Sequence, residues 1–367
     1  MGRRNHILHG YAPEPICDAH IHIKMQMPVN ATNYVIGELM EHFNYERALI
    51  CSLPNYDRTD NYRNFYLKSK LAPKIYTAVG LDHHFDARDT AEYYLHQIKQ
   101  YHKMGCDGVK MFEGKVFLHR KLGKKLCDPV FDLFYGYCEE HQIPITLHLG
   151  DPLDHWDITK MNDYALKNGW YCGPEDPTRE ELREEIDQVL QKFPNLPIIF
   201  AHFNYMGDEP KRAAEMIDTY PNICFDLTPG GEMFIAFTEH WDAARAFFVK
   251  YQDRILYGTD SYNWRPKDVT LEEQNGKRVN LVRRFLEETE VFTESTMNTP
   301  FKPFGFSSEI LDNIYRKNFI RLFGETPRPL NHALIAEGAK ALLAEKDDSF
   351  TPLMTENLYT IIDHFEK

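Results

Sequence analysis

The chain has 367 residues, a formal net charge of −13 and 43% hydrophobic residues. This length exceeds two average domains but also fits a single barrel of repeated βα units, since such barrels routinely need about 250 residues or more. The acidic balance argues against a nucleic-acid partner, which calls for a basic surface, and no run approaches the ~20 apolar residues that span a membrane.

The cysteines argue against a disulfide framework. There are seven, an odd number, and no pair has the Cys-x-x-Cys spacing. The basic residues at the start of the chain are not followed by an apolar segment, so no secretory signal is expected. These observations predict a cytoplasmic protein.

The first predicted strand carries the most informative motif of the chain, Asp18-Ala19-His20-Ile21-His22, after the apolar entry Pro15-Ile16-Cys17. Side chains two positions apart on a strand point to the same face, about 7 Å apart along the backbone. His20 and His22 are therefore expected to converge on one side, where two imidazoles can share a metal ion.

Seven further short apolar runs follow, separated by amphipathic stretches. Each ends in a polar, Gly or Pro turn, which is typical of buried parallel strands. The eight predicted strands are 15–22, 47–54, 75–81, 108–112, 144–150, 197–203, 222–227 and 254–260.

Helices are predicted between these strands. The clearest runs from Thr178 to Lys192, with Thr178 as N-cap and apolar residues at helical spacing; 91–104 and 129–141 have the same character. Strand and helix alternating eight times indicates an α/β protein of the (β/α)8 TIM-barrel type. We expect one barrel domain over 1–324, a long loop after the fifth strand (151–177), and a C-terminal helical extension of the same domain over 325–367, helical at 331–345 and 354–366.

Metal-binding residue types lie at several predicted strand ends. Active sites of such barrels lie at the carboxyl ends of the strands. His20 and His22 end the first strand, and further candidates lie in or end the fourth, fifth, sixth and eighth strands: Lys110, His148, His202 and Asp260. Such a set is difficult to explain by structural roles alone.

The ordered motifs resemble the amidohydrolase superfamily, in particular its branch of metal-dependent hydrolases and decarboxylases related to aminocarboxymuconate-semialdehyde decarboxylase. The resemblance covers about residues 15 to 324 and includes a segment similar to the terminal helix of that branch. The motifs are 18–22, 108–110, 147–148, 200–203, 256–261, and 313–319 with 323–324. The resemblance implies the barrel and a metal, but it does not select a substrate.

The expected cofactor is one divalent metal ion, with zinc favoured by the imidazole and carboxylate donors. We assign His20, His22, His148 and Asp260 as ligands, with Asp260 also taking the proton of the metal-activated water. The resemblance implies that His202 either binds a second metal or hydrogen-bonds the water or substrate; a structural strand-end role is the alternative.

Lys110 has three alternatives. Its segment resembles the strand-four lysine that, in dihydroorotase-like and hydantoinase-like relatives, is carboxylated and bridges two ions. An unmodified Lys110 could instead pair with a substrate carboxylate, or pack structurally in the barrel. We expect one metal and an unmodified, site-lining Lys110; two metals would require its carboxylation.

Other candidates for the pocket lie in the loops. Glu113 and Lys115 follow the fourth strand, His83 and His84 follow the third, and Arg265 follows the eighth, where it could pair with a substrate carboxylate. In the strand-five loop, Trp156 could stack on a substrate; Trp170 lies in the same loop. Solvated or packing roles are the alternatives for these residues.

The leading functional hypothesis is a hydrolase in which metal-activated water attacks an amide, lactone or related small molecule. The alternative is a metal-dependent lyase, a non-oxidative decarboxylase or hydratase of an unsaturated or aromatic carboxylic acid. A non-catalytic binding barrel is disfavoured because Asp260 is present. Small-molecule substrates are expected, with no nucleic-acid or membrane partner, and a homo-oligomer is left open.

Overall fold

The computed structural model describes residues 15–23, 27–263, 269–294 and 299–367. Nine parallel strands form one curled sheet in the order β8-β7-β6-β5-β4-β3-β2-β1-β9. The strands are β1 (Ile16–His22), β2 (Tyr45–Cys51), β3 (Ile75–Val79), β4 (Gly108–Gly114), β5 (Ile145–Leu149), β6 (Ile198–Phe200), β7 (Ile223–Asp226), β8 (Ile255–Leu256) and β9 (Ser261–Tyr262).

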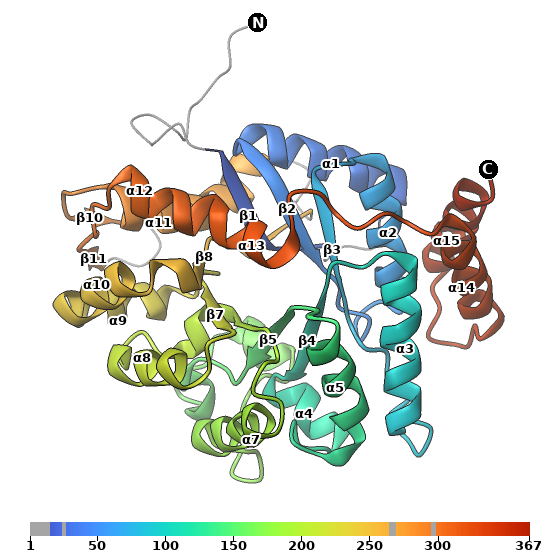
Figure 1. The fold of residues 1–367 in the computed structure, drawn as a ribbon, viewed down its shortest axis with the longest axis horizontal. Coiled ribbons are helices and arrows are strands. Elements are labelled where there is room, and N and C mark those ends of the chain that lie inside the picture. Colours follow the sequence, from blue (N-terminus) through green and yellow to red (C-terminus); the bar gives the residue numbers. More distant parts are fainter. Residues whose placement is uncertain (1–14, 24–26, 264–268, 295–298) are drawn as a thin grey trace, which may run out of the picture.

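Two short strands close the barrel. β8 lies within the predicted eighth strand (254–260) and pairs with β7, whereas β9 begins one residue after that range and pairs with β1. Residues 257–260 form the turn between the two strands instead of continuing the strand. Between them, the N–H of Ala19 donates to the carbonyl of Tyr257, and the N–H of Asp260 donates to the carbonyl of His20. The expected TIM-barrel fold is confirmed, with helices surrounding the strands (Figure 1).

The helices follow the strands around the barrel. They are α1 (Val29–His42), α2 (Asp60–Lys70), α3 (Ala91–Met104), α4 (Val116–Leu122), α5 (Asp132–Glu140), α6 (Asp163–Lys167), α7 (Arg179–Lys192), α8 (Pro210–Thr219), α9 (Gly231–Glu239), α10 (Trp241–Lys250), α11 (Leu271–Glu287), α12 (Ser308–Asp312), α13 (Asn318–Phe323), α14 (His332–Ala344) and α15 (Pro352–Phe365). Short 3-10 helices span Pro129–Phe131, Leu153–Trp156 and Gln252–Arg254, and Ala201–Tyr205 contains a tight left-handed turn. A π-helix spans Asn313–Lys317, and β10 (Phe292–Thr293) pairs with β11 (Pro300–Phe301).

Helix α7 begins where the sequence predicts. The Thr178 side chain accepts a hydrogen bond from the N–H of Glu181, and the Glu181 carboxylate accepts from the N–H of Thr178. This capping box satisfies two amide groups that the first helical turn leaves without an intrahelical partner.

Two of the three clusters of buried apolar residues in the described structure make up most of the core. The outward faces of the strands pack against the helices in one large cluster. A smaller cluster occupies the barrel interior, where Phe319 and Phe323 of α13 pack with Cys17, Ala19 and other small strand residues. Phe319 contacts the ring of Tyr76 edge-on, with 5.0 Å between ring centroids. Side chains of α13 therefore help to fill the interior.

The C-terminal extension is helical over nearly the predicted ranges. Helices α14 and α15 pack against each other and against α2 and α3 at one side of the barrel (Figure 1). Asn357 of α15 accepts from the N–H of Val29 and donates to the carbonyl of Met27. These bonds join the extension to the segment that leads into α1.

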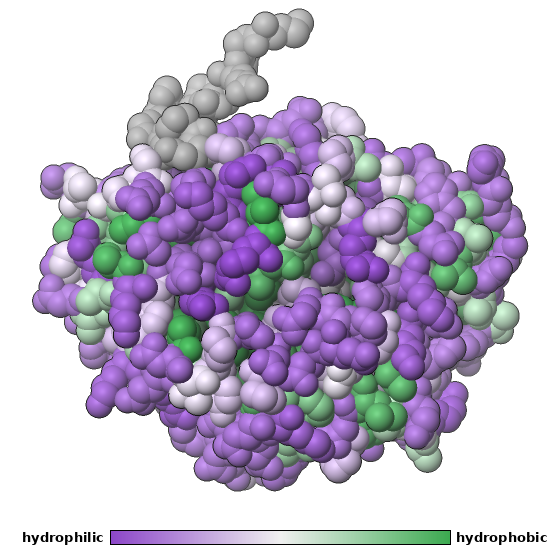
Figure 2. Space-filling model, in the orientation of Figure 1, coloured by the Kyte–Doolittle hydropathy of each residue, from purple (hydrophilic) through white to green (hydrophobic). Residues whose placement is uncertain are grey.

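The face of the molecule shown in Figure 2 is mainly hydrophilic, with apolar residues in separate patches. Among the described residues, no helix is both long and apolar enough to cross a lipid bilayer.

Candidate metal centre

A β-bulge directs the first histidine into the barrel. β1 pairs in parallel with β2, but Asp18 and Ile21 face Ala48 and Ile50, so that β1 contains one extra residue. Such a bulge re-aims the side chains that follow it. Cys17 and Ala19 belong to the interior cluster, and His20, three positions after Cys17, joins His22 in the site.

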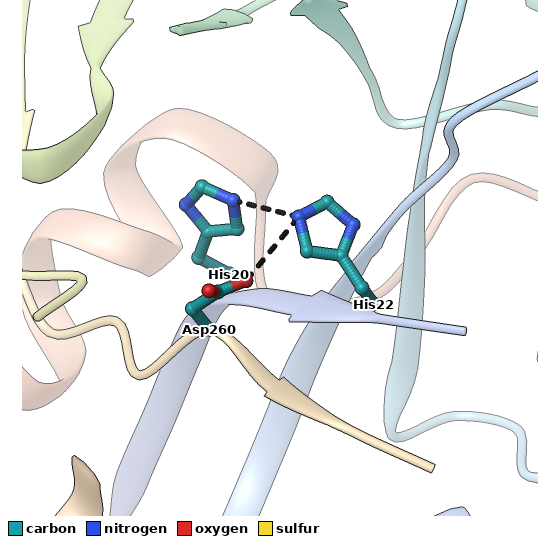
Figure 3. Close-up of side chains that lie close together, drawn as sticks. All are labelled: His20, His22 and Asp260. Carbon is teal, nitrogen blue, oxygen red and sulfur yellow. Dashed lines mark hydrogen bonds and ion pairs between the residues drawn. The ribbon is translucent and has the colours of Figure 1, made fainter. Parts of the chain in front are cut away.

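His20, His22 and Asp260 form the centre of the site (Figure 3). One ligand atom of each lies within 4.8 Å of the others. The two Nε2 atoms of the histidines are 3.1 Å apart, and the Nε2 atom of His22 is 3.6 Å from Oδ1 of Asp260. Both imidazoles are buried.

The hydrogen-bond partners of the two Nδ1 atoms determine which ring nitrogen of His20 and of His22 carries the proton. The Nδ1 atom of His20 is 2.7 Å from Oδ2 of Asp226, and the Nδ1 atom of His22 is 2.8 Å from the carbonyl oxygen of Cys51. Because both partners are acceptors, each Nδ1 carries the proton and each Nε2 presents a lone pair in the neutral ring. Two lone pairs that face each other at 3.1 Å, beside a carboxylate, are the donor set that a divalent cation requires, so these residues fit the expected metal.

Asp260 reaches the site from the turn between β8 and β9. Its backbone is left-handed, with φ of 52°, a conformation that Asp adopts more readily than most residues. Asp18 stabilises the start of this turn by accepting from the N–H and hydroxyl of Thr259. A Cβ atom on Gly258 would lie 2.9 Å from Oγ1 of Thr228 and 3.2 Å from Cβ of His20, so this close approach requires glycine.

The second oxygen of Asp260 is engaged by a residue that sequence reasoning missed. Arg278 of α11 donates to Oδ2 at 3.0 Å. An arginine 18 positions away on a helix carries no pattern that would point to the site. This bond makes Oδ2 a poor acceptor for a proton from water.

His148 and His202 lie beside this centre as a second pair. The Nδ1 atom of His148 is 3.2 Å from Nε2 of His202, and the rings of His202 and His20 have centroids 5.8 Å apart. His148 falls outside the group within 4.8 Å, although its Nε2 is buried and has no hydrogen-bond partner among the described residues. Burial lowers the pKa of His148 and lowers that of His202 to about 4, which keeps both rings neutral.

His202 lies in a tight left-handed turn rather than on a strand. The predicted sixth strand extended to 203, but β6 ends at Phe200, and residues 202 to 205 have φ between 50° and 55°. This rare conformation for four consecutive non-glycine residues carries backbone strain of the kind that surrounding contacts must offset.

Asp226, at the end of β7, was also missed. Burial opposes its ionisation, but the adjacent His20 and the hydrogen bonds that it accepts lower its pKa. The sequence did contain a signal for Asp226, which is the single charged residue of the predicted strand 222–227 and lies near the strand end where the other candidates meet.

Lys110 is buried in the barrel beside these histidines. It pairs in register with Thr146 of β5, two positions before His148, so its side chain and that of His148 share one face. The charge of Lys110 contributes to lowering the pKa values of His20, His148 and His202. Its Nζ atom is buried without a hydrogen-bond partner among the described residues, and burial lowers its own pKa.

The loop residues that the sequence predicts for the pocket contact protein side chains outside the group of His20, His22 and Asp260. The carboxylate of Glu113 lies 2.7 Å from Nε2 of His83, with its second oxygen buried and unpaired in the described structure. Lys115 forms a buried ion pair with Asp151 and lies over the ring of Trp170. These contacts indicate that Lys115 and Trp170 anchor the loop that follows β5.

Trp156 packs partly buried against the main hydrophobic cluster, and its indole nitrogen has no hydrogen-bond partner within the described ranges. His83 and His84 line a cavity of about 720 Å³ together with residues of the C-terminal extension, among them Glu345 and Asp347. Arg265 lies outside the described residues.

Comparison with known proteins identifies the family. Residues 58–324 match the model of the family described as Amidohydrolase, so the chain belongs to this amidohydrolase family of enzymes. No curated protein matches significantly.

Solved structures share the fold at low identity. An IDCase of Metarhizium anisopliae, solved in its apo form, is 14% identical with a TM-score of 0.54, covering 85% of this chain and 97% of its own. An uncharacterised TIM-barrel protein of Bordetella bronchiseptica, Bb4693, is 15% identical with a TM-score of 0.53, covering 84% and 98%. An amidohydrolase of Burkholderia multivorans with bound zinc is 10% identical with a TM-score of 0.50, covering 86% and 100%.

Proposed function

We propose that this protein is a zinc-dependent lyase that removes carbon dioxide from an unsaturated or aromatic carboxylic acid without an external oxidant. His20, His22 and Asp260 would hold the ion, with His148 as a further ligand. The zinc-containing structure of the same fold supports the choice of metal. When bound, zinc acts as a Lewis acid that polarises a substrate oxygen.

The environment of Lys110 favours a lyase over a hydrolase. A buried amine without a hydrogen-bond partner is costly, and a carboxylate is the partner that offsets this cost best. An acid substrate would supply that carboxylate, whereas a neutral amide or lactone would leave the amine unpaired.

Asp260 supports the same choice. Hydrolysis requires a base that accepts the proton of the attacking water, the role expected from the sequence. The Oδ2 atom of Asp260 is instead engaged by Arg278, and Oδ1 faces His22. Asp260 is therefore better suited to hold a metal than to accept a proton.

The proton needed for the reaction comes from Lys110 in this proposal. As the bond between the ring or vinyl carbon and the carboxyl carbon breaks, its electron pair stays on the former, and carbon dioxide leaves. The Lys110 amine takes up one proton from solvent as the substrate carboxylate binds, and the resulting ammonium donates this proton to that carbon and returns to the amine. Burial, which lowers the pKa of this ammonium, favours the transfer.

A substrate panel tests the proposal. Zinc-loaded protein is incubated with dihydroxybenzoic acids and unsaturated dicarboxylic acids, and in parallel with lactones and anilides, and carbon dioxide and hydrolysis products are measured. We expect carbon dioxide release from an acid, lost in Lys110→Met and kept in the matched surface control Lys125→Met. Turnover of lactones or anilides with no release from any acid would instead establish the hydrolase.

A cytoplasmic location remains part of the proposal. All seven cysteines are free in the structure, which fits a reducing compartment.

A further inference from the structure

We infer that Asp226 and Thr228, at the end of β7 and just after it, fix which ring nitrogen is protonated in His20, His202 and His148, and that His202 is a positioning residue for His148 rather than a metal ligand. This inference rests on the metal site of the proposed function. The residues to which it assigns new roles, Asp226, Thr228 and His202, lie outside the group of His20, His22 and Asp260.

Two branches of hydrogen bonds lead from the end of β7 to the histidines, and the first links Asp226 with His20. Oδ2 of Asp226 lies 2.7 Å from Nδ1 of His20, and Oδ1 accepts from the backbone N–H groups of His202 and Thr228, at 2.9 and 3.0 Å. An ionised carboxylate can only accept, so the Nδ1 atom of His20 must carry the proton. The Nε2 atom that faces His22 is thereby left with its lone pair.

Thr228 lies at the junction of the two branches. Its hydroxyl oxygen is 2.9 Å from Nδ1 of His20, and its carbonyl oxygen is 3.1 Å from Nδ1 of His202. The carbonyl can only accept, so the Nδ1 atom of His202 also carries a proton.

The second branch continues from His202 to His148. With Nδ1 protonated, the neutral ring of His202 has one acceptor left, Nε2, which lies 3.2 Å from Nδ1 of His148. The proton in this bond must therefore belong to His148. Its Nε2 atom, buried and without a hydrogen-bond partner in the described part of the chain, keeps a lone pair.

Both nitrogens of His202 are thus engaged, one by the Thr228 carbonyl and the other by His148. No lone pair remains for a second ion, and His202 is absent from the group of close ligand atoms found among the described residues. The bond from Asp226 to the His202 amide also holds the strained left-handed turn that places this ring. Outer partners of this kind set the orientation and proton position of metal-binding histidines.

Zinc affinity tests the inference without reference to activity. Asp226→Asn replaces an acceptor-only group by one with an amide donor, which favours the wrong proton position on His20. We measure zinc binding by competition with a chromophoric chelator, and the visible spectrum of cobalt-loaded protein as a report on ligand geometry. We expect affinity to fall about 10- to 100-fold in Asp226→Asn, with a changed cobalt spectrum.

Glu185→Gln provides the matched control. Glu185 is also a buried carboxylate that contacts a histidine, His119 at 3.1 Å, but it lies in another part of the barrel. This variant should keep wild-type zinc affinity. His202→Ala should weaken zinc binding while keeping the wild-type number of ions per chain.

Three results would overturn the inference. They are wild-type affinity in Asp226→Asn, an equal loss in Glu185→Gln, and a fall from two ions to one in His202→Ala. If Asp226→Asn does not fold, wild-type affinity in His202→Ala overturns it as well. Failure of the unaltered protein to bind zinc would instead refute the proposed metal site, and zinc binding without lyase activity would refute only the proposed reaction.

Discussion

Replacing Lys110 by Met should stabilise the protein while abolishing its activity. Met keeps most of the apolar stem of Lys110 and removes an amine that is buried without a hydrogen-bond partner among the described residues. Burying such a polar group costs about 1–3 kcal/mol in protein mutational data. We expect the free energy of unfolding of the metal-free protein to rise by a similar amount in Lys110→Met.

The gain in the free energy of unfolding of Lys110→Met should depend on pH in a defined direction. Burial lowers the pKa of Lys110 in the folded state, so the unfolded chain binds more protons between the lowered pKa and the ordinary lysine value of about 10.4. Wild-type stability therefore rises with pH across this window. The advantage of Lys110→Met is largest below the lowered pKa and shrinks as pH approaches about 10.4.

Chemical denaturation followed by circular dichroism, at several pH values and without metal, measures both effects. Lys125→Met, at an exposed position, serves as the control for a lost positive charge. A Lys110→Met protein less stable than wild type by 1 kcal/mol or more would show that the amine has a stabilising partner in the metal-free protein. Lys110 would then no longer favour a substrate that carries a carboxylate.

Three further changes test other parts of the structure. Asp260→Asn, which removes the negative charge from the proposed ligand set, should weaken zinc binding at least as much as the loss of an outer partner of a metal ligand does, about 10- to 100-fold, and lower turnover with it, and wild-type zinc affinity would exclude its role. Lys68→Met, which leaves the buried Asp107 carboxylate without the ammonium 2.6 Å away, should cost about 3–5 kcal/mol in denaturant unfolding, and a loss below 1 kcal/mol would show that the pair is dispensable. Thr178→Ala removes the α7 cap and should cost about 1 kcal/mol, whereas Thr178→Ser should cost less; equal losses would argue against the capping bond.

The barrel and the centre of the site could be predicted because their signals are local. The strand with His20 and His22 is an apolar run with a His-x-His ending, and Asp260 ends another such run. Parallel strands bring their carboxyl ends to one edge whatever the loops contain. The convergence of these residues therefore required no knowledge of the helices.

The remaining parts of the site depend on tertiary contacts that no periodicity records. Arg278 reaches Asp260 from α11, and the bulge after Asp18 becomes evident only from the register between β1 and β2. The sixth strand ends early because its last predicted residues form the left-handed turn at His202. The roles of Asp226 and Thr228 depend on which atoms face the histidine rings, which the spacing along the chain does not determine.

The metal content of the purified protein decides whether His20 and His22 form a metal site. Protein purified without added metal is analysed by mass spectrometry of its metals, in parallel with the double variant His20→Ala, His22→Ala, and the fold of both is checked by circular dichroism. We expect about one zinc ion per chain in the wild type and none in the variant, with an unchanged barrel spectrum. Full retention of metal in a folded double variant would contradict this expectation.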